Sequence, residues 1–222
     1  QLDDEGMLVK TEKLVHNVVF SERTDAVIEP KLSMQWFCKM EELAKPALDH
    51  VMNDDIKFYP SKFKNTYKHW MDNVRDWCIS RQRTWGVPIT LFVHKETGDL
   101  HPDTQSLIET VALKVEEQGI DAWFDLDPKE LLGDEADKYQ KVTDTLDVWF
   151  DSGVTHAAVL EEHPELHTPA DLYLEGSDQH RGWFQSSLLT SVAARGTAPY
   201  KTVLTHGFTV DGDGKKMSKS LG

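Results

Sequence analysis

The chain has 222 residues, with 24 Lys or Arg against 38 Asp or Glu, which gives a formal net charge of -14 at pH 7. This length can bury one good core or about one and a half domains, and the negative charge disfavours a surface that binds nucleic acid or membranes except through a local basic patch. Because no run approaches the roughly 18 apolar residues of a membrane span, no signal peptide opens the sequence and its two cysteines make no disulfide framework, we expect a cytoplasmic protein with reduced thiols.

The first part of the chain alternates between extended and helical patterns. Short alternating runs within residues 7–20 and a second run at 28–37 predict strands, and Pro30 favours a strand end or edge. The pattern then predicts a helix at 40–53, a strand at 56–59 and an amphipathic helix at 63–74.

The middle of the chain predicts a buried strand at 88–94 and a helix that begins at Asp103 or Thr104 and ends before Gly119. We expect four apolar side chains of this helix to point inward, namely Leu107, Ile108, Val111 and Val115. Residues 125–141 are acidic and irregular, which indicates a surface insertion, and 146–150 predicts another strand.

The last fifty residues have the pattern of half a nucleotide-binding α/β unit. A short apolar run ends in the polar turn at 175–178, and a second strand is predicted over 203–208. The helix between them ends at the capping Gly196 and has one apolar face, made of Trp183, Phe184, Ser187, Leu188, Ser191 and Val192. After the second strand come a hairpin turn at 211–214 and a lysine-rich loop. From residue 77 onward we expect a mostly parallel sheet covered by helices.

Four strings in this sequence occur in the same order in one family. They are WCISRQ at 77–82, DVWFDSG at 147–153, EGSDQHRGW at 175–183 and KMSKS at 216–220. Together they resemble the catalytic domain of class I aminoacyl-tRNA synthetases, in particular the isoleucyl and valyl enzymes, over nearly the whole chain. The resemblance implies an α/β, Rossmann-like fold and the ATP-dependent joining of an amino acid to tRNA.

That chemistry needs alignment and positive charge where phosphate charge develops, and lysines on a glycine-flanked loop suit this need. By resemblance, Lys216 and Lys219 act in catalysis, and Lys219, Ser218, His206 and Gly207 bind ATP, which enters with Mg²⁺ as a substrate. A solvated basic tail is the alternative for the lysine string taken alone.

The turn after the first strand of this unit is expected to hold the aminoacyl-adenylate. By resemblance, Glu175, Gly176, Asp178 and Gln179 contact it, and Gly176 lets the backbone approach the ligand closely. Asp178 as the N-cap of the following helix is a structural alternative that is compatible with this role.

Trp85 and Trp183 are, by resemblance, the walls of the amino acid side-chain pocket, and an ordinary core position is the alternative for each. A slot between two indoles suits a branched aliphatic side chain. It rejects a smaller one only weakly, because a missing methylene is worth about 1–3 kcal/mol.

We predict no metal held by this segment. His163 and His167 have the spacing of a zinc pair, but Pro164 disfavours a helix across them. The loop at 211–214 lacks the closing glutamate of a calcium loop. Asp147 and Asp151 could pass for a catalytic carboxylate pair, and we interpret them as scaffold.

The sequence lacks the His-x-Gly-His string of the first half of the family's nucleotide fold. We therefore expect residues 1–30 to be the β-rich end of an editing insertion and 31–222 to be the second half of the catalytic domain, ending at the KMSKS loop. The partners would include the remaining domains of a parent synthetase, and the isolated piece would be inactive.

Residues 1–82 look more like valyl enzymes, as in IEPKLSMQWF at 28–37 and FKNTY at 63–67. Residues 83–222 look more like isoleucyl enzymes, as in RTWGVP at 83–88, LFVHK at 91–95 and DQHRGW at 178–183. Because the pocket and the lysine loop lie in the second part, the prediction is activation of isoleucine and its transfer to the cognate tRNA, without membrane contact. A valine enzyme is the alternative, and a non-catalytic binding module is the alternative from another class.

Overall fold

A computed structural model describes residues 3–21 and 24–217, and the chain divides into two units, Gln1–Met34 and Gln35–Gly222. The described residues of the first unit hold one antiparallel bridge, Phe20 to Val27, and no regular strand. The strands predicted at 7–20 and 28–37 are therefore wrong, apart from Phe37 at the end of the second. A strand needs a neighbour for its N–H and C=O groups, and within these described residues only the 20–27 turn supplies one.

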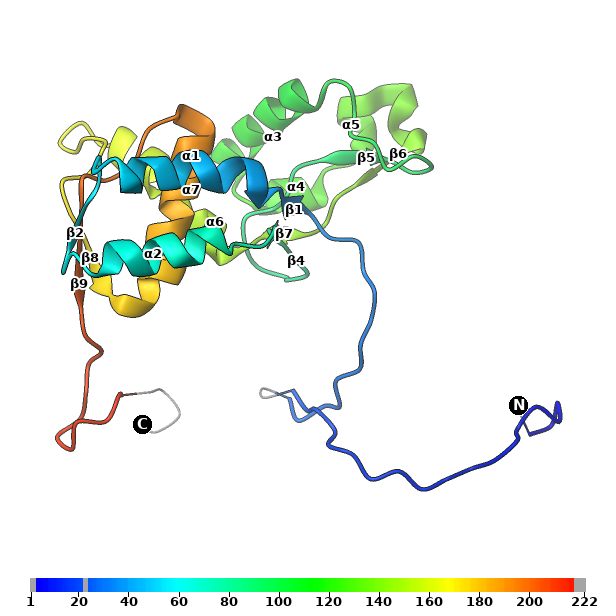
Figure 1. The fold of residues 1–222 in the computed structure, drawn as a ribbon. Coiled ribbons are helices and arrows are strands. Elements are labelled where there is room, and N and C mark those ends of the chain that lie inside the picture. The colour runs from blue at the N-terminus through cyan, green and yellow to red at the C-terminus, as the bar shows by residue number, and fades with distance from the viewer. Residues whose placement is uncertain (1–2, 22–23, 218–222) are drawn as a thin grey trace. The chain divides into compact units, whose positions relative to one another are not determined.

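The second unit is built on a three-stranded parallel sheet in the order β2 (Lys57–Tyr59), β9 (Thr202–His206) and β8 (Tyr173–Gly176). Helices α1 (Met40–Met52), α2 (Phe63–Asp72) and α7 (Trp183–Arg195) pack with this sheet (Figure 1). We call the cluster that they bury the first core: Met40, Ala44, Ala47, Val51, Ile56, Phe58, Tyr67, Met71, Tyr173, Phe184, Leu188, Leu189, Val192, Tyr200 and Val203.

The three helices of the first core agree with the predicted patterns. On α7 the predicted inward face is buried from Phe184 to Val192, and Trp183 is half-buried. The helix ends at Gly196, whose φ of 69° lies in the left-handed region and whose N–H donates to Val192 O. Glycine adopts this conformation without steric cost, which is why the sequence signal for the helix end was reliable.

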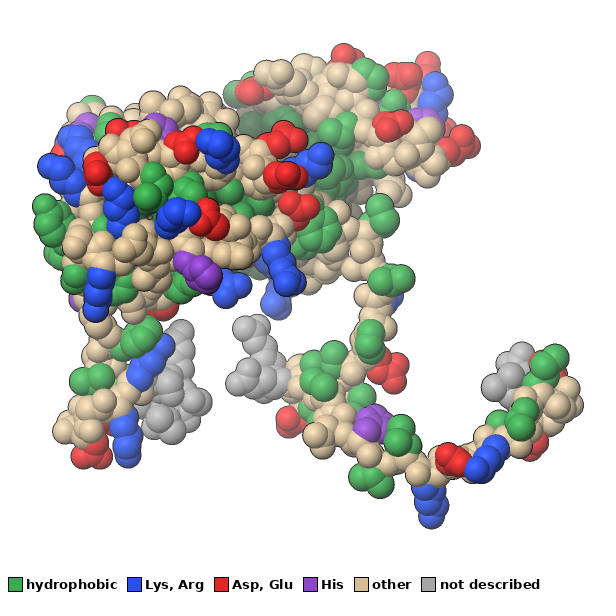
Figure 2. Space-filling view, in the orientation of Figure 1, with side chains coloured by type: hydrophobic (Ala, Val, Ile, Leu, Met, Phe, Trp, Pro, Cys, Tyr) green, Lys and Arg blue, Asp and Glu red, His purple; other side chains and the backbone are tan. Residues whose placement is uncertain are grey.

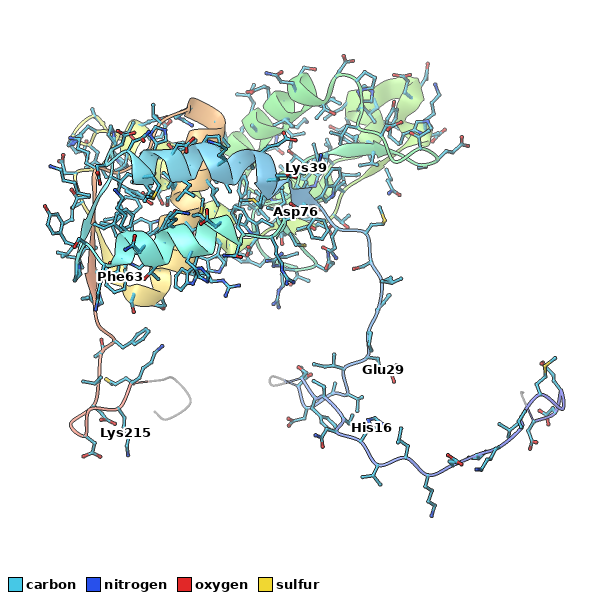
Figure 3. All side chains as sticks on the ribbon, in the orientation of Figure 1. His16, Glu29, Lys39, Phe63, Asp76 and Lys215 are labelled. Carbon is cyan, nitrogen blue, oxygen red and sulfur yellow. The ribbon has the colours of Figure 1, made fainter. Side chains whose placement is uncertain are left out.

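The outer faces of α1 and α2 carry acidic and basic side chains side by side (Figure 2). Lys45 and Asp49 form an ion pair at 2.8 Å one turn apart on α1, and Lys68 pairs with Asp72 on α2. Asp76 lies at the start of α1, beside Lys39 (Figure 3), and its carboxylate accepts the Met40 N–H at 3.0 Å. A carboxylate at a helix N-terminus satisfies a free donor and complements the helix dipole.

A second core lies under α3 (Thr104–Gln118). It also involves β5 (Phe92–His94), which pairs antiparallel with β6 (Tyr139–Lys141), and the short helices α4 (Asp121–Asp125), α5 (Pro128–Leu132) and η1 (Gly133–Lys138). Its buried side chains are Phe92, Leu107, Val111, Trp123, Leu126, Leu132 and Ala136.

Two predictions for this region are wrong. Residues 125–141 are no irregular insertion, because Leu126, Leu132 and Ala136 lie between the charges and are buried, and the Asp127 side chain caps α5. On α3 the inward stripe is narrower than predicted: Leu107 and Val111 are buried, Val115 is half-buried, and Ile108 is 38% exposed.

The remaining strands form antiparallel pairs. They are β1 (Phe37–Cys38) with β3 (Trp77–Cys78), and β4 (Ser80–Arg81) with β7 (Thr145–Leu146). The strand predicted at 146–150 is wrong beyond Leu146, because α6 (Val148–Gly153) begins there, followed by the π-helix η2 (His156–Glu161). A mostly parallel sheet from residue 77 onward is also wrong, since the parallel strands are β8, β9 and the earlier β2. Within the described residues, no helix is long and apolar enough to cross a bilayer.

Candidate functional site

The carboxyl ends of β8 and β9 meet at one edge of the parallel sheet. Glu175 lies opposite Thr205, and Gly176 lies opposite His206. Both chain segments therefore leave the sheet at the same level, where ligands bind in open α/β folds. Glu175 and His206 are exposed there.

The turn after β8 is the 3-10 helix η3 (Ser177–Arg181), which carries Asp178 and Gln179. A side-chain Cβ added at Gly176 would lie 2.8 Å from Asp178 Oδ1 and 3.8 Å from His206 Cε1. The carboxylate and the imidazole thus both lie close to Gly176, and a side chain at this position would displace the Asp178 carboxylate. The structure therefore brings Gly176, Asp178 and His206 together.

Gln179 closes the N-terminus of α7, because its Oε1 accepts the Trp183 N–H at 2.9 Å. The N-cap residue itself is Gly182, where an added Cβ would lie 2.6 Å from Gln179 Oε1. The structural alternative that made Asp178 the N-cap of this helix is therefore wrong, because Asp178 lies within the 3-10 helix η3 that precedes α7. The predicted cap failed because η3 inserts five residues before α7 begins.

The two predicted pocket indoles have different surroundings. Trp183 stacks on Tyr173, with ring centroids 3.9 Å apart, and its Nε1 donates to Ser152 O at 3.0 Å. Trp85 is 81% exposed, and the ring contacts found among the described residues do not include it. Among the described residues, no ring contact joins the exposed Trp85 to the half-buried Trp183.

A cavity of about 460 Å³ lies beside the turn that leads into α7. Trp149 of α6 lines it next to Gly182, and an added Cβ at Gly182 would lie 3.2 Å from the Trp149 ring. The other lining residues are Met40, Trp70, Asn73, Val74, Arg75, Asp76, Trp77, Cys78, Arg81, Arg181, Gln185, Ser186 and Leu189. Sequence reasoning missed Trp149 because it predicted a strand at 146–150 and interpreted the neighbouring Asp147 and Asp151 as scaffold.

Asp147 holds one wall of this cavity. Its Oδ2 accepts the Trp77 Nε1–H at 2.9 Å and lies 3.1 Å from an Arg81 guanidinium nitrogen. Arg81 also donates to the backbone oxygens of Cys78 and Ser80. Burial, and then the nearby Asp147 charge, raise the pKa of Asp151. These contacts explain Asp147 as a structural anion, so no catalytic pair is needed to account for it.

Lys216 lies on a hairpin that follows β9. Val210 and Lys216 form an antiparallel bridge, and the Asp211 carboxylate accepts the N–H groups of Asp213 and Lys215 at 2.9 Å each. The Lys216 ammonium lies 3.6 Å from the centroid of the Phe208 ring. The predicted hairpin turn is confirmed, whereas Ser218 and Lys219 lie outside the described residues.

Comparisons with known proteins give the family. A family described as "tRNA synthetases class I (I, L, M and V)" matches residues 1–222. The chain is 59% identical over its whole length to an isoleucine--tRNA ligase of Saccharophagus degradans and 58% identical to one of Alcanivorax borkumensis, and it spans 24% of each.

A solved methionyl-tRNA synthetase of Mycobacterium tuberculosis with methionyl-adenylate resembles the fold at a TM-score of 0.53 and 18% identity. The match covers 95% of this chain and 33% of that one. The resemblance inferred from the four sequence strings is thus confirmed at the level of the family, and the chain belongs to the class I tRNA synthetases of the isoleucine, leucine, methionine and valine group.

Proposed function

We propose that this chain is the part of an isoleucine-tRNA ligase that activates isoleucine with ATP and passes it to the cognate tRNA. The observation that carries the proposal is the convergence of Gly176, Asp178 and His206 at one sheet edge. It occurs in a chain that is 59% identical, over its full length, to an isoleucine--tRNA ligase. The chain spans about a quarter of the length of such relatives. The same proposal assigns residues 1–30 to the end of an editing insertion and residues 31–222 to the second half of the catalytic domain.

The sheet edge suits the acyl-adenylate intermediate. Glu175 and Asp178 offer carboxylates to an ammonium group and to ribose hydroxyls, and Gly176 leaves room for a ligand to lie against the backbone. Gln179 is oriented by its bond to the Trp183 N–H. His206 and Gly207, at the end of β9, border the adenine in this assignment. Magnesium enters with ATP and not as a resident metal.

The hairpin after β9 supplies the positive charge that faces the phosphates of ATP. Phe208 holds the Lys216 ammonium over its ring, a contact that tethers the cation without neutralising it. Lys216 and Lys219 stabilise the negative charge that develops on the α-phosphate during adenylate formation, and Ser218 contacts the same nucleotide. These groups neither bond to the substrate covalently nor need to, because alignment and electrostatics supply the rate.

Trp183 forms one wall of the isoleucine pocket in this proposal. Trp85 remains the predicted opposite wall, and Trp149 is a second candidate because it borders the cavity beside Gly182. Replacing each of the latter two by Ala separates the candidates: the wall residue should raise the KM for isoleucine, whereas the other should leave it near the wild-type value.

The substrate can be tested in a chimaera that carries these 222 residues in place of the matching segment of the Saccharophagus degradans ligase. Isoleucine-dependent exchange of pyrophosphate into ATP should exceed valine-dependent exchange by roughly 10–200-fold. The unmodified ligase is the control. A preference for valine would make the valyl-like residues 1–82 the better guide to the substrate. No exchange with either amino acid would favour a non-catalytic module.

A further inference from the structure

The turn that carries Asp178 and Gln179 also carries a fully buried histidine. His180 is 0% exposed, although both of its ligand-facing neighbours on η3 are not buried. Its imidazole stacks on Phe63, with centroids 4.7 Å apart and planes 16° apart, and on Phe58 at 5.9 Å. Figure 3 labels Phe63 at the start of α2. Tyr67, Trp70 and Phe184 approach the same imidazole edge-on.

One polar contact connects this imidazole to the sheet. His180 Nε2 lies 2.9 Å from Thr205 Oγ1, and Thr205 is itself buried in β9 opposite Glu175. The bond therefore joins the turn after β8 to the neighbouring strand, one residue before His206. Among the described residues of η3, no other side-chain hydrogen bond reaches β9.

A phenylalanine ring, which has no polar atom, would fill this position at a lower cost in folding free energy than the histidine does. The His180 Nδ1 is buried and has no hydrogen-bond partner among the described residues, and a buried polar atom without a partner destabilises a fold. Burial lowers the pKa of His180 to about 4, so the imidazole is neutral at pH 7 and contributes no charge. What histidine provides here and phenylalanine does not is the bond to Thr205.

We propose that His180 is a positioning residue, which holds η3 against β9 through Thr205 so that Asp178 and Gln179 keep the orientation that binds the substrate. The inference rests on the proposed function. Asp178 and Gln179 directly precede His180 in the same short 3-10 helix, so a rotation of η3 that displaces the imidazole also displaces both of them. Without the bond, η3 has only packing to define its rotation relative to the sheet edge.

The test uses the chimaeric ligase with His180→Phe, which keeps an aromatic ring, and Thr205→Val, which keeps the side-chain shape. Each variant removes the bond. Each variant should raise the KM for isoleucine and for ATP by about tenfold with kcat little changed, as expected for lost ground-state orientation. His180→Gln, whose amide can reach Thr205, should restore part of the affinity. The double variant should be no worse than either single variant, because the two residues act through one bond.

Stability separates positioning from a general role in folding. His180→Phe should melt at the same temperature as the parent chimaera or higher, because an unpartnered polar atom leaves the core. His156→Phe is the matched control, since His156 is also buried with an unpartnered Nδ1, yet lies on η2. It should leave both KM values unchanged. Unchanged KM values in the two bond-removing variants overturn the proposal, and so does a fall in kcat that tracks a lower melting temperature.

Amide hydrogen exchange gives a readout that does not depend on catalysis. In both bond-removing variants, residues 177–182 should exchange about tenfold faster while α7 beyond its first turn is unchanged. Wild-type exchange in η3 overturns the positioning role even if the chimaera has no activity. An inactive parent chimaera with faster η3 exchange in the variants would instead refute the proposed function and leave the positioning contact supported.

Discussion

Two polar side chains, the half-buried Lys141 beside the second core and the buried His180 in the first core, bond to their surroundings in opposite ways. In the second core, Lys141 Nζ donates to three backbone oxygens, of Trp123, Phe124 and Leu126, at 2.7 to 2.8 Å. In the first core, His180 has one bond, to Thr205, and a second nitrogen without a partner among the described residues. The lysine satisfies carbonyl groups at the end of α4, whereas the histidine beneath the candidate site has a ring nitrogen without a hydrogen-bond partner among the described residues.

This difference indicates a division of labour. Lys141 satisfies carbonyl groups that a helix end leaves free, which stabilises the fold locally. The residues of the candidate adenylate site, by contrast, lie at the sheet edge beside the first core. Where every buried polar group has a hydrogen-bond partner, the arrangement serves stability. Where a buried polar group lacks one, as at His180, a functional role is expected. The predictions below test whether the two cores are separable in this sense.

The largest expected effect on stability comes from Trp123→Ala in the second core. Trp123 is fully buried, packs edge-on against Phe92 at 5.2 Å and donates to Val142 O at 2.9 Å. Removing the indole should cost about 3–5 kcal/mol. Hydrogen exchange in the chimaera should show lost protection across 92–141 with protection of α7 retained. Equal loss in both regions would show that the two cores open as one unit.

Acid should weaken the first core more than the second. Because burial lowers the pKa of His180 from 6.5 to about 4, the unfolded chain takes up a proton that the folded chain does not. This group has no effect above pH 6.5, and stability is lost as pH falls below it, by about 2 kcal/mol at pH 5 and about 3 kcal/mol at pH 4. Burial also lowers the pKa of His156, which acts in the same direction.

The measurement is the exchange-derived opening free energy of α7 and α3 between pH 7 and pH 5, corrected for intrinsic exchange rates. His180→Phe should reduce the acid sensitivity of α7 and leave that of α3 unchanged. An α7 in the variant that stays as sensitive as in the parent would show that other groups dominate.

Lys141→Met should have the smallest of these effects. It keeps most of the side-chain volume but leaves three carbonyl groups without their donor, at a cost of about 1–3 kcal/mol. Lys138→Met is the control, because Lys138 is exposed and pairs only with the exposed Glu135 in the described structure. The control should change opening free energies of α4 by no more than about 0.5 kcal/mol. Similar losses in both variants would refute the role of the three bonds.

Patterns local in the sequence predicted the helices well. The bounds of α1, α2, α3 and α7 follow from apolar side chains at helical spacing and from terminators such as Gly119 and Gly196. Residues 146–150 failed because Val148, Trp149 and Phe150 form a short apolar run that a strand and a buried helix share. Asp147 before this run and Gly153 at its end were the signals that favour a helix.

Long-range features were not predictable in this way. β2 pairs with β9, about two-thirds of the chain away in sequence, and no local pattern reveals which distant strand is the partner. The gathering of Gly176, Asp178 and His206 was predicted only because the family resemblance named those positions. His180 was missed, since a histidine in a polar string does not reveal that its ring turns inward toward Phe63 and Phe58.

Pyrophosphate exchange in the chimaera, with and without Lys219→Ala, tests most directly whether this segment carries out isoleucine activation. The account predicts isoleucine-dependent exchange in the parent chimaera and a loss of about 10²–10³-fold in the variant, as for a lost transition-state donor, with the melting temperature unchanged. Wild-type exchange rates in Lys219→Ala would contradict the account.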